Sequence, residues 1–197
     1  MAILPLVIAP DPRLKTRSEP IAEVTDEIRR LAADMFDTMY YERGVGLAAV
    51  QVGVLVRMMV ADVEWKSDGE KGTQWVFINP EILSSSEEPH LYKEGCLSFP
   101  EQYAEVERPQ SVRVRFTDLQ GQRREENFDG LLATCVQHEI DHLNGVVFVD
   151  HISRVKRDII LRRLQKMKKQ GVISHREHHP YQDHGDHEHV HGEHCNH

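Results

Sequence analysis

Three features that would assign the chain to a large class of proteins are scarce or missing. No stretch of about 18 uncharged apolar residues occurs, so we expect no membrane span. The chain has only three cysteines, an odd number that suits metal or thiol chemistry, or buried thiols, better than a disulfide framework. Basic residues number 24 against 32 acidic ones, and the net charge of -8 argues against a general nucleic-acid-binding protein.

A secretory signal is also missing from residues 1–20. The apolar stretch Ile3–Ala9 is short, no basic segment precedes it, and Asp11 and Pro12 end it. We therefore expect a cytoplasmic protein. The length of 197 residues, with 40% apolar and 28% charged residues, is typical of one globular domain with modest appendages.

The composition changes sharply near Gly171. Nine of the thirteen histidines lie between Ser174 and His197, where Val190 is the lone aliphatic residue. Such a segment cannot bury enough apolar surface to offset the entropy cost of ordering it. We expect a folded domain over residues 1–171 and a disordered, His-rich tail over 172–197. The tail composition suits the binding of extra metal ions, and an inert, solubilising extension is the alternative.

Hydrophobic periodicity divides the folded part into helices and strands. Apolar residues spaced three and four apart after Thr25 predict a helix that stops at Gly44. Strands and helices are segregated along the chain, which favours an α+β fold over a parallel α/β sheet. The patterns predict helices over about 25–43, 129–145 and 153–170, strands over 54–63, 75–83 and 112–116, and a hairpin turn at 118–121.

A possible metal motif lies in the second of these helices. His138 and His142 are four residues apart, so they share one helix face and can reach one cation, with Glu139 beside them as a possible base. The pattern alone is weak, because it occurs again at His187–His191 in the tail, without an amphipathic helix to fix its geometry. Taken alone, His138 and His142 could equally be hydrogen-bonded core histidines.

Two further segments add to this motif. Glu94–Pro100 contains Cys96, and one thiol with two histidines would leave the fourth tetrahedral position open, as in catalytic metal sites. Cys96 could also be a small buried hydrophobic residue. Gly44–Gln51 has small residues that permit close backbone approach and ends in an amide donor, although a tight turn with an exposed glutamine is the simpler reading.

Together these segments resemble the signature of the peptide deformylase family, which is G-x-G-x-A-A-x-Q, then E-G-C-x-S, then Q-H-E-x-D-H. The chain reads GVGLAAVQ from Gly44, EGCLS from Glu94 and QHEIDH from Gln137, in the family's order. The EGCLS form is similar to the bacterial branch. The resemblance implies an α+β fold in which antiparallel sheets surround a central helix carrying the HExxH motif, with helices near both ends. It also implies a hydrolase that removes the formyl group from the N-terminal formylmethionine of new proteins and releases formate.

The resemblance implies a role for each matched residue. Cys96, His138 and His142 would bind one divalent metal ion. Glu139 would be the general acid and base, and Gln51 with the backbone N–H of Leu97 would stabilise charge on the formyl oxygen. Glu94 would support the site from behind the ligands. It is grouped with the residues expected to bind the substrate methionine, which are Val45, Gly46, Tyr92, Leu131, Thr134 and Cys135.

The resemblance also implies a cofactor and partners. The usual metal of the family is ferrous iron, with zinc, nickel or cobalt as substitutes. Similar deformylases contact the ribosome near the exit tunnel through their C-terminal helix. Here the predicted helix over 153–170 carries eight basic residues and one acidic residue, although a solvated face would have the same composition. Tyr103 stands where close bacterial relatives often carry arginine, so their contact to the downstream peptide backbone is not carried over.

Two other functions share part of this pattern. A zincin-type protease contains H-E-x-x-H but takes a third histidine or an acidic residue as ligand, not a preceding cysteine. A metal-storage or metal-delivery protein would account for the tail, but it would not need Gln51 beside a three-ligand site. Formate release from a formyl-Met peptide distinguishes the deformylase from both.

Overall fold

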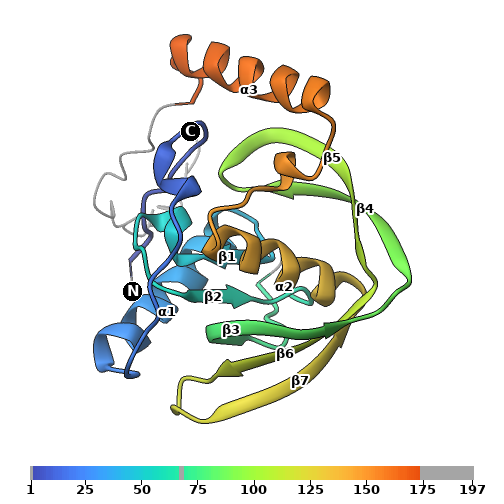
Figure 1. The fold of residues 1–197 in the computed structure, drawn as a ribbon. Helices are drawn as coiled ribbons and strands as arrows, with labels where there is room; N and C mark the ends of the chain where they lie inside the picture. The colour runs from blue at the N-terminus through green and yellow to red at the C-terminus, as the bar shows by residue number, and fades with distance from the viewer. Residues whose placement is uncertain (1, 67–68, 174–197) are drawn as a thin grey trace, which may run out of the picture.

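The computed structural model describes residues 2–66 and 69–173 (Figure 1). Helix α1 (Asp26–Tyr41) begins after Thr25, whose side-chain oxygen accepts a hydrogen bond from the N–H of Ile28. The helix therefore starts where its cap predicts. It ends slightly earlier than expected, because the chain turns at Arg43 (φ 59°) and not at Gly44. The predicted tail lies almost wholly outside the described residues, and the boundary near Gly171 stays a prediction.

A five-stranded antiparallel sheet forms one side of the molecule. Its strand order is β1-β2-β3-β6-β7, which makes the short strand β1 one of its two edges. Asp118 accepts hydrogen bonds at the turn between β6 and β7, as the predicted hairpin requires. The strands are β1 (Gly46–Ala48), β2 (Met58–Ala61), β3 (Trp75–Ser85), β6 (Ser111–Thr117) and β7 (Arg123–Asp129).

The predicted strand over 54–63 is too long. Residues Ala49–Val52 form a 3-10 helix, η2, and Gly53 takes a left-handed conformation (φ 81°) before the chain extends again. The N–H of Arg57 bonds to the Glu19 carbonyl, so ladder pairing with β3 begins only at Met58. Apolar composition therefore marked the buried segment but not the point at which it joins the sheet.

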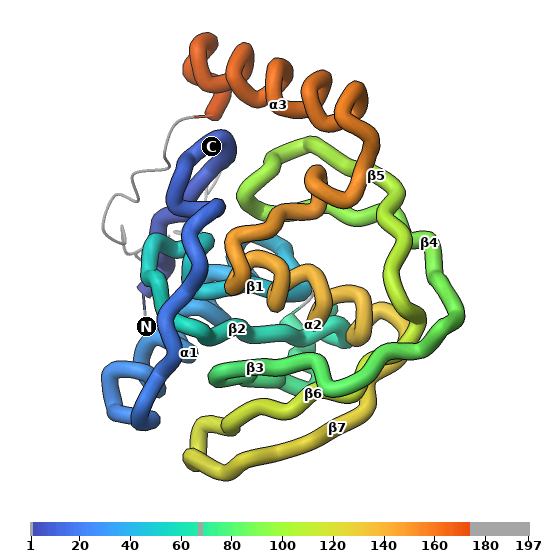
Figure 2. The backbone as a smooth tube through the Cα atoms, viewed as in Figure 1, coloured from blue at the N-terminus to red at the C-terminus, as the bar shows by residue number. Residues whose placement is uncertain are grey.

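A second, two-stranded sheet is not in the sequence prediction. It consists of β4 (Pro89–Cys96) and β5 (Phe99–Pro109), which pair antiparallel and form a long curved hairpin (Figure 2). Most of β4 is exposed, so its side chains do not alternate between an apolar and a polar face. Without that alternation the segment gives no strand signal.

Helix α2 (Gly130–Leu143) lies between the five-stranded sheet and the β4–β5 hairpin (Figure 1). Its residues Val136 and Ile140 belong to a core cluster with Phe77, Val114 and Phe128 of the sheet. Nearly the whole helix is buried, which fixes the direction of every side chain that it carries. This arrangement confirms the predicted α+β fold with antiparallel sheets around a central helix.

Helix α3 (Arg154–Lys169) lies across the far side of the β4–β5 hairpin (Figures 1 and 2). It buries Ile160 and Leu164 in a cluster with Phe99 and Phe148, and most of its basic side chains are exposed. Two further short 3-10 helices are η1 (Pro12–Lys15) and η3 (Phe148–Asp150). Among the described residues, no helix is both long and apolar enough to cross a membrane.

Candidate metal-binding active site

Cys96, His138 and His142 lie together, as the sequence predicts. The two histidines are one turn apart on α2, and Cys96 is placed against them by the tight end of the β4–β5 hairpin. The Cys96 Sγ atom is 3.2 Å from Nε2 of His142, and one ligand atom from each of the three residues lies within 4.8 Å of the others. Both imidazoles are buried, whereas Cys96 is half-buried.

These three residues fit a divalent transition-metal ion. A thiolate and two imidazoles are the donors that such ions prefer, and three protein ligands leave room for water or substrate. Burial, and then the neighbouring His138, lower the pKa of His142 well below its usual value, which favours the neutral form that binds metals. Nδ1 of His138 lies 2.7 Å from Oε2 of Glu94, and a carboxylate behind a histidine ligand orients its ring.

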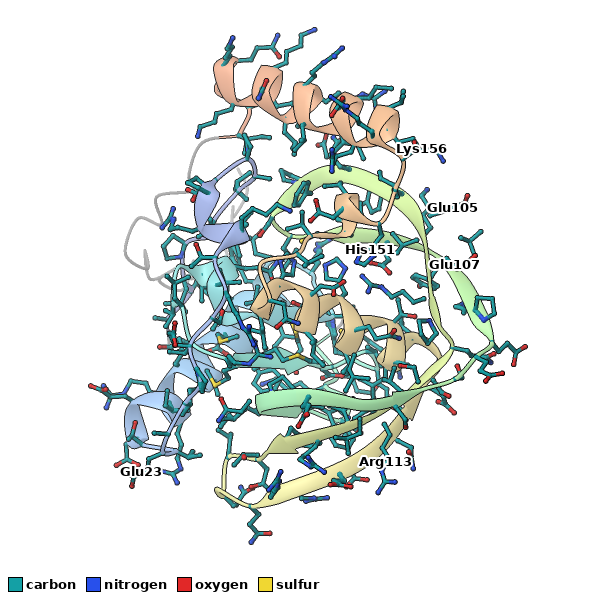
Figure 3. All side chains as sticks on the ribbon, viewed as in Figure 1. Glu23, Glu105, Glu107, Arg113, His151 and Lys156 are labelled. Atoms are coloured by element: carbon teal, nitrogen blue, oxygen red, sulfur yellow. The ribbon has the colours of Figure 1, made fainter. Side chains whose placement is uncertain are left out.

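Glu94 is itself held by a chain of charges. Arg108 donates to both of its carboxylate oxygens, at 2.5 and 3.1 Å, and also to Asp141 at 2.8 Å. Asp141 in turn lies 2.7 Å from Nε2 of His151, which is labelled between α2 and β5 in Figure 3. Burial would raise the pKa of Glu94, but the bonds from His138 and Arg108 outweigh it and lower the pKa. Glu94 therefore stays ionised behind the ligand.

Gln51 is oriented by its own backbone neighbourhood. Its Oε1 accepts a hydrogen bond of 2.8 Å from the N–H of Ala48, so its Nε2 points the other way, towards Cys96 Sγ (3.4 Å) and Ser98 Oγ (3.3 Å). The side chain is only 1% exposed. The simpler reading of an exposed glutamine is therefore wrong, and the amide donor faces the candidate metal site.

Glu139 follows His138 on α2 and is buried. Its Oε2 is among the few buried side-chain atoms of the described residues that have no hydrogen-bond partner. Burial raises the pKa of this carboxyl to about 7. A carboxyl with a free oxygen and a pKa near neutrality can both accept and return a proton.

One cavity of about 460 Å³ joins these groups. Every residue singled out as a site residue lines this cavity except His142, which is fully buried and contacts Cys96. Gly46 brings the cavity wall very close to α2, because a Cβ atom there would be 2.5 Å from Cys135 Sγ and 2.7 Å from Glu139 Oε1. Tyr103, which is 61% exposed, also lines the cavity.

The sequence did not single out several residues that belong to this site. Arg108 binds Glu94 and Asp141, yet in the sequence it is one more charged residue in a polar segment. Arg43 and Gln102 line the cavity from the end of α1 and from β5. Arg108 had no local signal, because its partners come from β4 and α2. Arg43 directly precedes the GVGLAAVQ segment, and that position was the available clue.

Known proteins are similar to this chain in both sequence and fold. A family model described as polypeptide deformylase matches residues 3–158. A peptide deformylase of Rhodopseudomonas palustris is 54% identical over 172 residues, which cover 87% of this chain and 98% of that protein. A crystal structure of a peptide deformylase from Legionella pneumophila is similar with a TM-score of 0.80 at 43% identity, covering 88% of this chain and 99% of the other.

A third similar protein has been solved with a ligand. The structure of peptide deformylase from Ehrlichia chaffeensis in complex with actinonin gives a TM-score of 0.81 at 42% identity. The match covers 86% of this chain and 99% of that one.

Proposed function

Because the chain belongs to the peptide deformylase family, hydrolases that remove the formyl group from nascent peptides, we propose that Glu139 transfers the protons of this reaction beside a metal ion held by Cys96, His138 and His142. One observation carries the proposal. The buried Glu139 carboxyl has an oxygen without a partner, and it lines the same cavity as Cys96 and the Gln51 amide.

Each part of the proposed reaction is assigned to a different group of the site. A divalent ion in such a site supplies Lewis acidity towards water and the formyl oxygen. Glu139 accepts a proton from the attacking water and returns it to the departing amine. Gln51 Nε2 and the backbone N–H of Leu97 donate to the formyl oxygen as negative charge builds on it. Formate and a free N-terminal amine leave.

We assign the methionine side chain to the largely apolar part of the cavity. Tyr92 lines it from β4, Val45 and Gly46 from β1 and the residue before it, and Leu131, Thr134 and Cys135 from α2. Burial, with the nearby charge of Glu139, raises the pKa of the Cys135 thiol well above its usual value, so this side chain offers a neutral, weakly polar surface. An unbranched thioether suits such a wall. We assign actinonin, which the Ehrlichia chaffeensis protein binds, to the same cavity.

We propose ferrous iron as the metal, with zinc, nickel or cobalt as possible replacements in purified protein. A thiolate ligand favours metals that tolerate sulfur, and a ferrous ion beside a thiolate is sensitive to oxidation. Protein purified without oxygen should therefore contain close to one iron per chain and lose activity in air. Elemental analysis of the same samples checks this, and full activity of an aerobically stored iron protein would contradict it.

The proposed partner beyond the substrate is the ribosome near the peptide exit, contacted through α3. The support is the cluster of exposed basic side chains on this helix, including Arg162, Arg163 and Lys166. Such contacts weaken steeply with salt. Because α3 buries Ile160 and Leu164, deleting it would also disturb the core, and replacing the three basic residues by glutamine is the cleaner test. Unchanged co-sedimentation with ribosomes at low salt would contradict the proposal.

We propose that the His-rich segment over 172–197 binds extra metal ions. We also propose that the enzyme acts in the cytoplasm, because its substrates are nascent chains. Ending the chain at Gly171 and titrating both forms with Ni²⁺ tests the first proposal. Equal metal stoichiometry would contradict it.

The function is tested by formate release from formyl-Met-Ala-Ser. Glu139→Ala should keep its metal and lose about 10²–10⁴-fold in kcat, because general acid–base catalysis typically contributes this much. Glu188→Ala, the same change in the second copy of the motif, is the matched control and should keep full activity. A near-wild-type rate in Glu139→Ala would overturn the mechanism. Cleavage of an unblocked peptide without formate release would favour a zincin-type protease.

A further inference from the structure

The segment that joins β2 to β3 folds back onto the cavity wall. Nε1 of Trp65 donates a hydrogen bond of 2.7 Å to the carbonyl of Gly44, and the N–H of Asp62 donates one of 2.9 Å to the carbonyl of Val45. Strand β1 is an edge of its sheet, and its pairing with β2 begins only at Gly46. The carbonyls of Gly44 and Val45, which precede the ladder, are therefore held by this segment.

Asp62 gives the segment a fixed shape. Its side chain is fully buried, and one carboxylate oxygen accepts from the hydroxyl of Tyr40 (2.7 Å) and the N–H of Gly72 (3.0 Å). The other oxygen accepts from the N–H of Glu64 at 3.1 Å. A buried carboxylate with several donors orders the backbone on both sides of it.

Trp65 is anchored on α1 as well as on the cavity wall. Its ring meets the ring of Tyr40 edge to face, with centroids 5.5 Å apart and planes at 69°. Burial and the bond to Asp62 raise the pKa of Tyr40 to about 12, so its hydroxyl stays protonated and continues to donate. The indole is thus held between a rigid helix and the backbone that it contacts.

The other face of the held backbone touches residues proposed for the reaction. A Cβ atom on Gly44 would lie 2.7 Å from Cδ1 of Leu97, and one on Gly46 would lie 2.7 Å from Oε1 of Glu139. Gly44, Val45 and Gly46 all line the cavity, so a shift of this backbone at Gly44 changes the space available to a substrate.

We propose that Trp65 is a positioning residue. By holding the Gly44 carbonyl, it sets the distance between the Gly44–Gly46 segment and Leu97, and thereby the affinity for the formylated peptide. The inference rests on the deformylase activity, but it concerns contact with the side chain of Leu97 and not the backbone N–H that is proposed to donate to the formyl oxygen. It therefore predicts a change in substrate binding with no change in the chemical step.

Trp65→Phe tests this in the full-length, metal-loaded enzyme. The substitution keeps an aromatic ring against Tyr40 and removes the hydrogen bond. We expect KM for formyl-Met-Ala-Ser to rise about three- to tenfold with kcat unchanged, since a lost neutral hydrogen bond that contributes equally to ground and transition states acts on KM alone. Metal content should equal that of the wild type.

The second tryptophan of the chain supplies the matched control. Trp75 packs against Phe77 and Phe128 and does not line the cavity. Trp75→Phe should lower the thermal midpoint and leave KM unchanged. If Trp65→Phe keeps the wild-type KM, or if Trp75→Phe raises KM as much, the proposal is overturned. Absence of formate release by the wild-type enzyme would contradict the function instead.

A binding measurement separates positioning from simple stabilisation. In Trp75→Phe, Trp65 is the only remaining indole. Addition of the product peptide Met-Ala-Ser should change its fluorescence, with a dissociation constant equal to the inhibition constant of that peptide. If the emission stays constant while the peptide inhibits, peptide binding does not change the surroundings of Trp65, and the inference is overturned.

Discussion

The two walls of the cavity are held in place by different forces. On one side, α2 and the β4–β5 hairpin are joined by buried charges, in which Glu94 links His138 to Arg108. On the other side, the Gly44–Gly46 segment is held through its backbone by Trp65 and by pairing with β2. The first wall is held by specific charged side chains. The second consists mainly of backbone, because two of its three residues are glycines.

This difference matches the proposed division of labour. Metal ligands must keep their orientation closely, and a carboxylate that is itself bound by a buried arginine cannot turn away without leaving a charge unpaired. The opposite wall is proposed to receive a peptide, and the hydrogen bonds from Trp65 and β2 that hold it are between neutral groups. We infer that losing a contact of the charged wall costs folding and metal binding, whereas losing a hydrogen bond of the backbone wall costs substrate affinity.

The largest effect is expected from breaking the charged wall at Arg108. Arg108→Met leaves the carboxylate of Glu94 buried and without the two hydrogen bonds and the positive charge that Arg108 supplies. The free energy of unfolding should fall by about 3–5 kcal/mol, the usual cost of orphaning a buried charge. Chemical denaturation of the metal-loaded protein measures this loss.

Arg113→Met is the matched control for Arg108. Arg113 lies exposed on β6, where it pairs with Glu125 at 2.8 Å and is labelled in Figure 3. This variant should lose at most about 1 kcal/mol. Equal losses in the two variants would mean that the buried ion pairs of Arg108 contribute no more to stability than the exposed ion pair of Arg113.

The next effect concerns the amide donor between the two walls. Gln51→Ala should lower kcat by about 10²–10³-fold, the typical loss of one donor to a developing oxyanion. Ser98→Ala removes only the hydroxyl beside Nε2 of Gln51, so a smaller loss is expected. Steady-state kinetics with formyl-Met-Ala-Ser measures both, and a larger effect in Ser98→Ala would contradict the assigned role of Gln51.

A smaller effect is expected when a methyl group is added to the backbone wall. Gly46→Ala would press on Cys135 and Glu139, and such overpacking costs about 1–3 kcal/mol. Activity should fall along with stability. Gly121→Ala, in the β6–β7 turn where a Cβ meets nothing within 4 Å, should be destabilised by backbone strain alone and keep its kcat. A fully active Gly46→Ala enzyme would show that Cys135 and Glu139 can move to accommodate the added methyl group.

The smallest effect is expected at the outer part of the cavity. Tyr103 is 61% exposed and holds Lys93 over its ring at 5.4 Å. If a bound peptide covers about 40 Å² of this ring, Tyr103→Ala should weaken binding by about 1 kcal/mol, or roughly fivefold in KM. A tripeptide and a dipeptide substrate should differ in this variant less than in the wild type. An unchanged difference would place the peptide elsewhere.

The sequence predicted the helices better than the hairpin that completes the site. Helix α2 gives a clear signal because its apolar residues repeat every three to four positions and its histidines lie one turn apart. The β4–β5 hairpin was missed because most of β4 is exposed, although buried and exposed residues alternate along much of β5. The resemblance, not periodicity, therefore singled out Cys96 as the third ligand.

Local signals also could not predict the groups that orient the site. Arg108 reaches Glu94 and Asp141 across long sequence separations, so its role follows only from the folded chain. Trp65 contacts Gly44 from a connecting segment whose composition is that of an ordinary loop. Sequence patterns identified the residues proposed for the chemistry, because their types are rare, but not the common residue types that hold them.

The backbone of Gly44–Gly46 limits the ways in which resistance to an inhibitor can arise by mutation. A compound whose contacts fall on the main chain of Gly44–Gly46 rests on atoms that every amino acid shares. Resistance by substitution at the two glycines would need a side chain at Gly44 or Gly46, and either one would collide with Leu97 or Glu139. Escape mutations are therefore expected around the rim, at exposed positions such as Tyr103, where the chain can change without harming its own reaction.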